Sequence, residues 1–159
     1  TSQAKLNSMA VDLIDVTLST DAEVLGNNDV IAQSIEIPNA VAVEGGSAII
    51  QSIMILDEND EALPIDLIFQ TDNTALASDE GEIVNISDAN ARDILGFVNV
   101  SNYTDLLNCQ VGIKTNIGLV VKAASTTKSI FVHAVNRSGG TYTPAATTDL
   151  KMKIGIVKD

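Results

Sequence analysis

The chain has 159 residues, of which 21 are acidic and 9 are basic, giving a net charge of −12. This length suits one domain with a hydrophobic core. Nucleic acids and anionic membranes attract basic surfaces, so the acidic excess argues against both as partners. No stretch approaches the roughly 20 consecutive apolar residues of a membrane span.

The chain begins with a short polar segment. Residues 1–8 predict an extended arm ahead of a single β-sandwich domain over 9–159. β-Branched residues over 11–18 then predict a first strand. Residues 26–29 (Gly-Asn-Asn-Asp) are typical of a turn, and the alternation over 30–37 predicts a second strand.

The most apolar stretch lies near the middle of the chain. Residues 47–56 follow two glycines and have two apolar faces, which is typical of a strand inside a core. An acidic turn over 57–61 and a second alternating run over 65–70 follow. Together these segments predict one antiparallel hairpin. The residues expected on one face of its first strand are Ile49, Ile53 and Ile55, and those on the other are Ala48, Ile50, Met54 and Leu56.

The only clear helix signal comes after the predicted hairpin. Residues 71–82 are polar and acidic, which predicts a surface loop. A helix is then predicted near 88–95. Ser87 can cap its first turn, and Gly96 suits a left-handed exit.

The last third of the chain returns to strand patterns. Strands are predicted over 97–100, 117–122, 130–135 and 150–157, with a turn over 101–105. About eight strands and one short helix near 88–95 predict an all-β fold, an antiparallel jelly-roll-like β-sandwich. The residues expected to face inward in the last strand are Leu150, Met152, Ile154 and Ile156.

The residue types that carry most enzyme chemistry are scarce. The single histidine, His133, lies in an apolar run with no second histidine or suitable cysteine as a partner, which favours a structural or interface role. The single cysteine, Cys109, has apolar neighbours and no basic cluster, so a small buried hydrophobe is expected. No nucleophile elbow or phosphate-binding glycine loop occurs. We therefore predict no catalytic residues, no cofactor and no enzyme activity.

Two acidic segments are the remaining candidates for ligand binding. Residues 57–61 resemble the start of a calcium loop, but Ala62 stands where that loop requires glycine, and Ile68 where it requires glutamate. A solvated turn is therefore expected, and no metal site is predicted. Together with residues 79–82, this segment leaves open a carbohydrate-binding module or a minor glycan hydrolase. The lack of tryptophan and an aromatic content of 3% argue against an aromatic sugar platform.

Five segments of strand and turn residues carry a resemblance to a known class of proteins. They are Ile35–Val41, Gly46–Ile53, Ile86–Ala89, Ile117–Ala123 and Leu150–Ile156. Across roughly residues 11–159, the chain resembles small structural proteins of tailed bacteriophages, namely the head decoration or cement proteins. The resemblance implies a non-enzymatic virion protein that is made in the bacterial host cytoplasm. Such a protein binds the major capsid protein on the outer surface of the head and stabilises the capsid.

The same resemblance, together with the surplus of apolar side chains over 47–56, predicts a homotrimer held by apolar strand faces. A neck, tail or baseplate component with the same architecture is the alternative within the virion. The polar arm is the first candidate for the capsid contact, because a flexible polar segment can order on binding. Its residues are Thr1, Ser2, Gln3, Ala4, Lys5, Leu6, Asn7 and Ser8.

Overall fold

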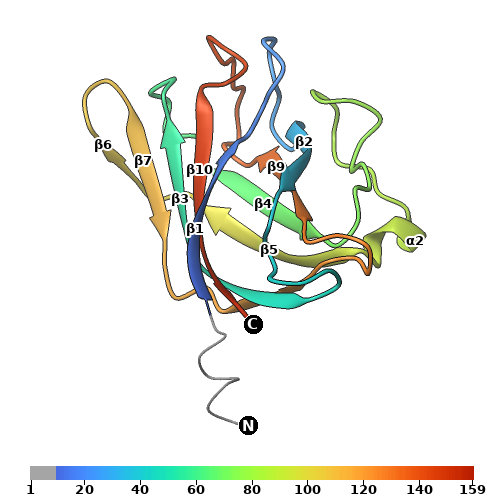
Figure 1. Cartoon of the computed structure of the whole chain (residues 1–159). Helices are drawn as coiled ribbons and strands as arrows, with labels where there is room; N and C mark the ends of the chain where they lie inside the picture. Colours follow the sequence, from blue (N-terminus) through green and yellow to red (C-terminus); the bar gives the residue numbers. More distant parts are fainter. Residues whose placement is uncertain (1–9) are drawn as a thin grey trace, which may run out of the picture.

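The structure, a computed structural model, describes residues 10–159 as two antiparallel β-sheets packed face to face, with one short helix (Figure 1). The prediction of an all-β sandwich is confirmed. The six-stranded sheet has the order β1-β10-β3-β7-β6, with β8 also paired to β3, and the four-stranded sheet has the order β2-β9-β4-β5. The strands are β1 (Ala10–Thr17), β2 (Val30–Ile37), β3 (Ser47–Asp57), β4 (Ile65–Gln70), β5 (Ile94–Val100), β6 (Tyr103–Asp105), β7 (Gln110–Lys114), β8 (Leu119–Lys122), β9 (Ile130–Asn136) and β10 (Leu150–Lys158), and the helix is α2 (Asp88–Ala91).

The strand pairing is that of a jelly roll. β1 pairs with β10, β2 with β9, β3 with β8, and β4 with β5, so the chain forms a nested series of antiparallel pairs. Successive pairs alternate between the two sheets, which is how a long folded hairpin wraps into a double-sheet sandwich. The β6–β7 hairpin is inserted between β5 and β8 and widens the six-stranded sheet.

The predicted hairpin over residues 45–70 is wrong. β3 belongs to the six-stranded sheet and β4 to the four-stranded sheet, so the connection between them crosses the sandwich. The Asp57 carboxylate organises this crossing by accepting the backbone N–H groups of Asn59, Glu61 and Leu63. The crossing spans seven residues (58–64), longer than the tight turns that join most paired strands.

The predicted faces of β3 are also wrong over part of the strand. The register against β10 shifts at Gln51, which bulges out between Ile50 and Ser52. One extra residue reverses the alternation, because strand side chains repeat every two residues. The side chains that face the core are therefore Ala48, Ile50, Ile53 and Ile55, and those on the outer side are Ile49, Met54 and Leu56.

The core lies between the two sheets and is almost entirely aliphatic. β10 contributes every second residue as predicted, and its lysines Lys151 and Lys153 point outward. β4 faces it from the opposite sheet with Ile65, Leu67 and Phe69, all fully buried. The core residues of β10 are Leu150, Met152, Ile154 and Ile156.

The helix is shorter than predicted. Ser87 caps it as expected, with its hydroxyl accepting the Asn90 N–H at 3.2 Å, but α2 ends at Ala91. Residues 94–96 instead begin β5, because the backbone there pairs with β4. Gly96 does not provide a left-handed exit. A Cβ at Gly96 would lie 2.6 Å from a terminal methyl group of Leu119, so a larger residue there would require the Leu119 side chain to move.

One short strand replaces most of the turn predicted over 101–105, and a second short strand follows it. Residues 103–105 form β6, and the unpredicted strand β7 pairs with it and with β3. The Tyr103 hydroxyl donates to the Leu63 carbonyl at 2.7 Å, which ties β6 to the crossing between the sheets. Among residues 10–159, no helix has the length and apolar character needed to cross a membrane.

Candidate binding surface on the six-stranded sheet

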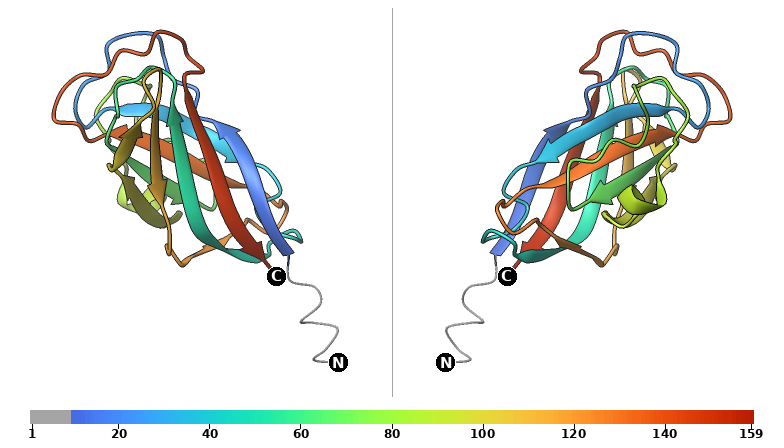
Figure 2. Two further views of the ribbon diagram at one scale, coloured as in Figure 1. Left: turned by 90° about the vertical axis from the view of Figure 1, so that its left-hand side faces the viewer. Right: turned by 90° about the vertical axis from the view of Figure 1, so that its right-hand side faces the viewer.

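The outer side of the six-stranded sheet carries aligned rows of apolar side chains. One row crosses four strands through the paired residues Val11, Val157, Ile49 and Val120. Figure 2 (left) shows this sheet with its strands facing the viewer. Because paired residues on one side of a sheet touch across strands, this row is one continuous apolar strip.

A second apolar group lies farther along the same side. Met54 and Leu56 on β3 pair with Ile113 and Val111 on β7. Leu106 and Leu107 form the turn between β6 and β7 next to this group. We call the two groups together the outer face: Val11, Leu13, Ile49, Met54, Leu56, Val111, Ile113, Val120 and Val157, with the β6–β7 turn beside it.

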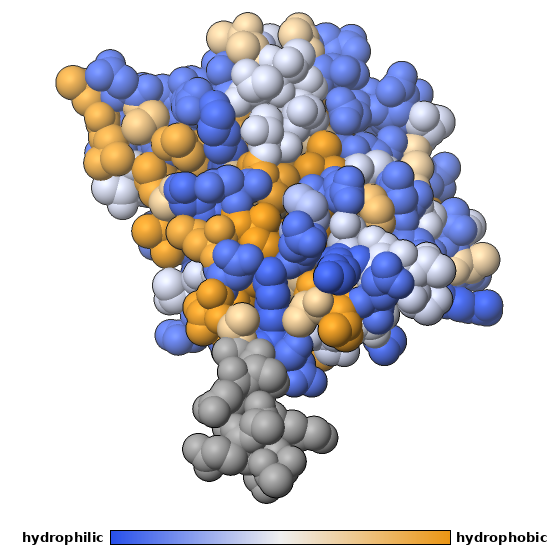
Figure 3. Space-filling model, in the orientation of Figure 1, coloured by the Kyte–Doolittle hydropathy of each residue, from blue (hydrophilic) through white to orange (hydrophobic). Residues whose placement is uncertain are grey.

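Many of the apolar side chains on the outer face are exposed to solvent. Six of the ten large exposed apolar side chains within residues 10–159 lie on it or on the β6–β7 turn: Val11, Leu13, Leu106, Leu107, Ile113 and Val120. Val11 and Leu107 are 82% and 81% exposed. Figure 3 shows apolar surface gathered on the side that the six-stranded sheet occupies in Figure 1. A concentrated patch of this kind marks an interaction site more often than scattered exposed residues do.

Charged side chains on the outer face largely neutralise one another. Lys153 pairs with Asp15 at 2.5 Å, and Lys151 pairs with Glu58 at 2.7 Å. With Lys122, whose Nζ donates to the Gly45 carbonyl, and Asp159, which follows β10, three lysines face three carboxylates, giving no net charge. The chain as a whole carries −12. The outer face is therefore a neutral area on an acidic protein.

Shallow hollows lie along the same face. One of about 290 Å³ is lined mainly by Ala48, Ile49, Val120 and Val157, beside Lys158 and Asp159. Another of about 340 Å³ lies between β6 and β7, lined by Leu106, Val111 and Ile113 among others. Both hollows are wide and open rather than enclosed, which suits a protein side chain or segment better than a small molecule.

Part of the outer side of the other sheet is covered by the chain itself. Leu76 and Ala77, in the predicted surface loop, pack on Val30, Ile68 and Val135 as a second small core. Figure 2 (right) shows this loop lying over the four-stranded sheet. The loop is fixed because one amide oxygen of Gln33 accepts the N–H groups of both Leu76 and Ala77 at 2.9 Å. Among residues 10–159, no comparable loop covers the six-stranded sheet.

His133 lies beneath this covering loop and is fully buried. Its Nδ1 accepts the Ser34 N–H at 2.9 Å, so Nε2 carries the proton and donates to the Gln70 side-chain oxygen at 2.7 Å. Burial lowers the pKa of His133 to about 4. A neutral imidazole with both nitrogens occupied supports the structural role favoured for this residue.

The acidic segment over 57–61 was expected to be a solvated turn, but its first residue, Asp57, is buried and has a structural role. Asp57 is fully buried, and burial raises the pKa of its carboxyl group against the opposing effect of the backbone N–H bonds. Glu58 pairs with Lys151, and Asp60 accepts a hydrogen bond from Gln110 at 3.0 Å. These carboxylates are occupied by partners within the fold.

The second acidic segment, over 79–82, is held by different neighbours. Glu80 accepts the Gln33 N–H at 3.1 Å, and burial, followed by repulsion from Asp21 and Asp79, raises the pKa of its carboxyl group. Within residues 10–159 no hydrogen bond joins this segment to residues 57–61, and no three His, Cys, Asp or Glu side chains come together as a metal site.

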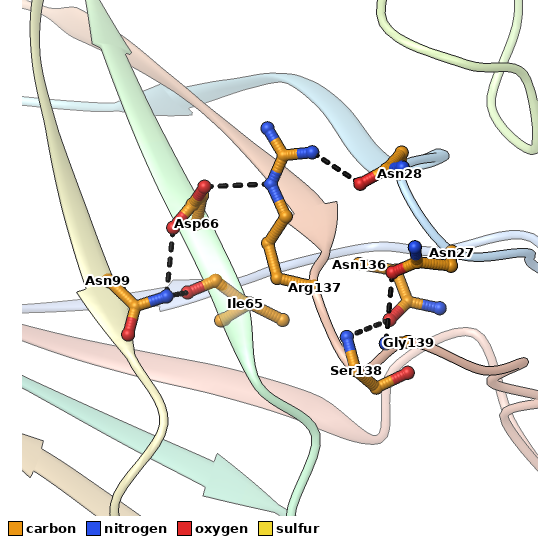
Figure 4. Close-up of polar contacts among 9 residues, drawn as sticks. All are labelled: Asn27, Asn28, Ile65, Asp66, Asn99, Asn136, Arg137, Ser138 and Gly139. Carbon is orange, nitrogen blue, oxygen red and sulfur yellow. Dashed lines mark hydrogen bonds and ion pairs between the residues drawn. The ribbon is translucent and has the colours of Figure 1, made fainter.

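The arginine and asparagine side chains near the ends of β4 and β9 form a third polar group (Figure 4). Asp66 accepts hydrogen bonds from Arg137 at 2.8 Å and from Asn99 at 2.9 Å. Arg137 also donates to Asn28 at 2.6 Å, and Asn27 accepts the Gly139 N–H at 2.9 Å. This network joins the turn after residue 25 to the turn after β9, so it stabilises the loops at this end of the sandwich.

Two further predictions concern single residues or segments. Cys109 is half-buried at the base of the β6–β7 turn, not fully buried as expected, because β6 and β7 form an edge hairpin with one side open. The predicted capsid contact, residues 1–8, lies outside the described residues.

No protein-family model matches the chain, and no curated protein sequence matches it. The outer face is therefore the feature of this structure on which a function can be based.

Proposed function

We propose that this chain is a structural protein of a tailed-bacteriophage virion, a decoration or cement protein that binds the outside of the head and stabilises it. Its partner is the major capsid protein, and it acts as a homotrimer on the capsid surface. The protein has no enzymatic role in this proposal. It is made in the bacterial host cytoplasm and joins the virion there.

The observation that carries the proposal is the bare apolar outer face of the six-stranded sheet. A sandwich that covers part of one sheet with its own loop and leaves the other sheet apolar and exposed is suited to binding other proteins. The polar groups support the same function. His133, Asp57 and the Asp66–Arg137 pair are each occupied by bonds that hold the fold together. The jelly roll agrees with this role but does not decide it, because one fold serves many functions.

The direct test is binding to phage heads. Purified protein is mixed with mature, emptied heads of the encoding virus that lack it, and the heads are sedimented. We expect saturable co-sedimentation and density on the outer capsid surface in electron micrographs. Density confined to the neck, tail or baseplate would favour that alternative. Binding to a glycan array without binding to heads would favour the carbohydrate-binding alternative and overturn the proposal.

The polar arm can be tested in the same assay. Removal of residues 1–8 is expected to weaken attachment to heads while leaving the circular dichroism spectrum and the thermal unfolding midpoint unchanged. Unchanged attachment would remove the arm from the capsid contact.

A further inference from the structure

The turn between β6 and β7 presents two leucines in a fixed conformation. Leu107 has a φ of 78°, a left-handed conformation that bulky residues rarely adopt. The Asp105 carboxylate accepts the Leu107 N–H at 2.7 Å, and the Leu106 N–H donates to the Cys109 carbonyl at 2.9 Å. Despite this fixed backbone, Leu107 is 81% exposed. The turn therefore forms a rigid apolar projection, which we call the leucine tip (Leu106 and Leu107).

An apolar hollow of suitable character lies on the same sheet. It is the hollow of about 290 Å³ lined mainly by Ala48, Ile49, Val120 and Val157, which we call the valine hollow. It lies along the β1-β10-β3-β8 row, whereas the leucine tip belongs to the β6–β7 hairpin at the far edge of the sheet. Because the two features lie on different strands, one copy of the chain presents both at once.

The distribution of charge favours a second copy as the occupant of the hollow. The strands of the six-stranded sheet carry five lysines (Lys114, Lys122, Lys151, Lys153 and Lys158) and four aspartates (Asp12, Asp15, Asp57 and Asp105), a net charge of +1. The strands of the four-stranded sheet carry Glu36 and Asp66 and no lysine or arginine. Lys158 and Asp159 both line the hollow, and Lys158 is already paired with Asp12 at 2.8 Å. The lysine that remains for a neighbouring copy is Lys122, which lies opposite Ser47 at the edge of the hollow, and it complements Asp105 beside the leucine tip.

We infer that the leucine tip of one copy inserts into the valine hollow of the next. Tip and hollow are different surfaces, so the contact is head-to-tail, and repeating it closes a ring when the rotation allows. The number of copies, three, rests on the proposed function, whereas the contact itself rests on the tip, the hollow and the charges. Each copy buries both of its apolar features in a closed ring.

The test uses one variant on each side of the contact. Val120→Lys places an ammonium group in the hollow, and Leu106→Asn with Leu107→Asn removes the tip. Asparagine tolerates the left-handed conformation at residue 107, so the turn is preserved. The control is Phe97→Lys, because Phe97 and Val120 are both 62% exposed and Phe97 lies on β5 of the other sheet. Each lysine lowers the net negative charge, so general repulsion cannot explain a loss of association.

Light scattering of the full chain gives the result. Wild type and Phe97→Lys are expected at three chains of 16.7 kDa, about 50 kDa. The hollow and tip variants are expected to associate at least about tenfold more weakly. Mixed in equal amounts, they should form a species of two chains, because the intact tip of one fits the intact hollow of the other. If circular dichroism shows that Val120→Lys is unfolded, Val157→Lys is used in its place.

Three results would overturn the inference. These are a monomeric wild type, variants that associate as well as wild type, and a mixture that yields no two-chain species. Head binding by the same proteins separates this inference from the proposed function. Variants that stay trimeric but lose head binding would place the capsid, not a copy, on this face. A trimer that uses this contact but binds no heads would overturn the proposed function alone.

Discussion

The buried histidine predicts a loss of stability in mild acid. His133 is fully buried, and its Nδ1 accepts the Ser34 N–H, so a second proton on the ring has no place to bind without breaking that bond. Its pKa is lowered by burial from 6.5 to about 4. Between these two values the unfolded chain binds a proton that the folded protein excludes. Lowering the pH through this range therefore favours the unfolded state.

The size of the effect follows from the two pKa values. Relative to pH 7 and above, the free energy of unfolding falls by about 2 kcal/mol at pH 5 and by about 3 kcal/mol below pH 4. Three carboxyl groups act in the opposite direction. The pKa values of Asp57, Glu61 and Glu80 are raised, chiefly by burial, so these groups add stability as the pH falls. The histidine effect must therefore be measured as a difference between two proteins.

The assay is urea unfolding of wild type and His133→Gln at pH 7 and pH 5, at equal protein concentration because association also contributes to stability. Wild type is expected to lose about 2 kcal/mol more than the variant between the two pH values. His133 is the only histidine, so the NMR signals of histidine ring C–H protons all belong to it. A signal that titrates near pH 6.5 in the folded protein would refute the reasoning, even if the variant failed to fold.

Two further predictions concern the core and the crossing between the sheets. Phe69→Ala, at a fully buried position, should lower the free energy of unfolding by about 3–5 kcal/mol in urea, whereas Phe97→Ala should change it by less than about 1 kcal/mol. Equal losses would contradict the assigned burial. Asp57→Asn should cost about 1–3 kcal/mol, because an amide cannot accept all the backbone N–H groups that the carboxylate accepts, while the exposed Asp60→Asn serves as the control in the same urea titration. An Asp57 variant as stable as the control would show that these bonds do not organise the crossing.

Regular alternation was the most informative part of the sequence. β10 alternates without interruption, so its inward and outward residues could be predicted one by one. β3 is equally apolar, but the bulge at Gln51 reverses its faces halfway. The bulge is fixed by distant partners. The Gln51 carbonyl accepts the Ile117 N–H, and β3 changes partner from β7 to β8 near this point. The hydrophobic pattern of residues 47–56 gives no information about a contact with a residue as distant as Ile117.

The predicted hairpin and the predicted length of the helix were wrong for related reasons. A strand that is apolar on both sides fits a hairpin or a crossing equally well, and the partners of β3 and β4 lie far away in the sequence. The predicted helix lost its second turn because residues 94–96 pair with β4. β7 was missed because it offers only Val111 and Ile113 as alternating apolar residues around Gly112.

The outer face was predicted in part. The apolar surplus on residues 47–56 indicated that some surface would need a partner, and Ile49, Met54 and Leu56 do lie on the exposed side of the sheet. The other members come from β1, β7, β8 and β10, so only the strand pairing brings them together. The loop that covers part of the other sheet was equally hidden, because Leu76 and Ala77 stand within a polar, acidic segment.

The position of β10 has a consequence for synthesis on the ribosome. β10 lies between β1 and β3, yet every other strand of both sheets precedes it in the chain. Until residues 150–158 have left the ribosomal tunnel, β1 has no neighbour in its sheet, and β3 exposes an unpaired edge beside its aliphatic core residues. Folding therefore cannot be completed gradually from the first residue onward. The nascent chain completes the six-stranded sheet only when β10 has been synthesised. Until then, the unpaired edge of β3 can bind chaperones, or other copies of the chain where their local concentration is high.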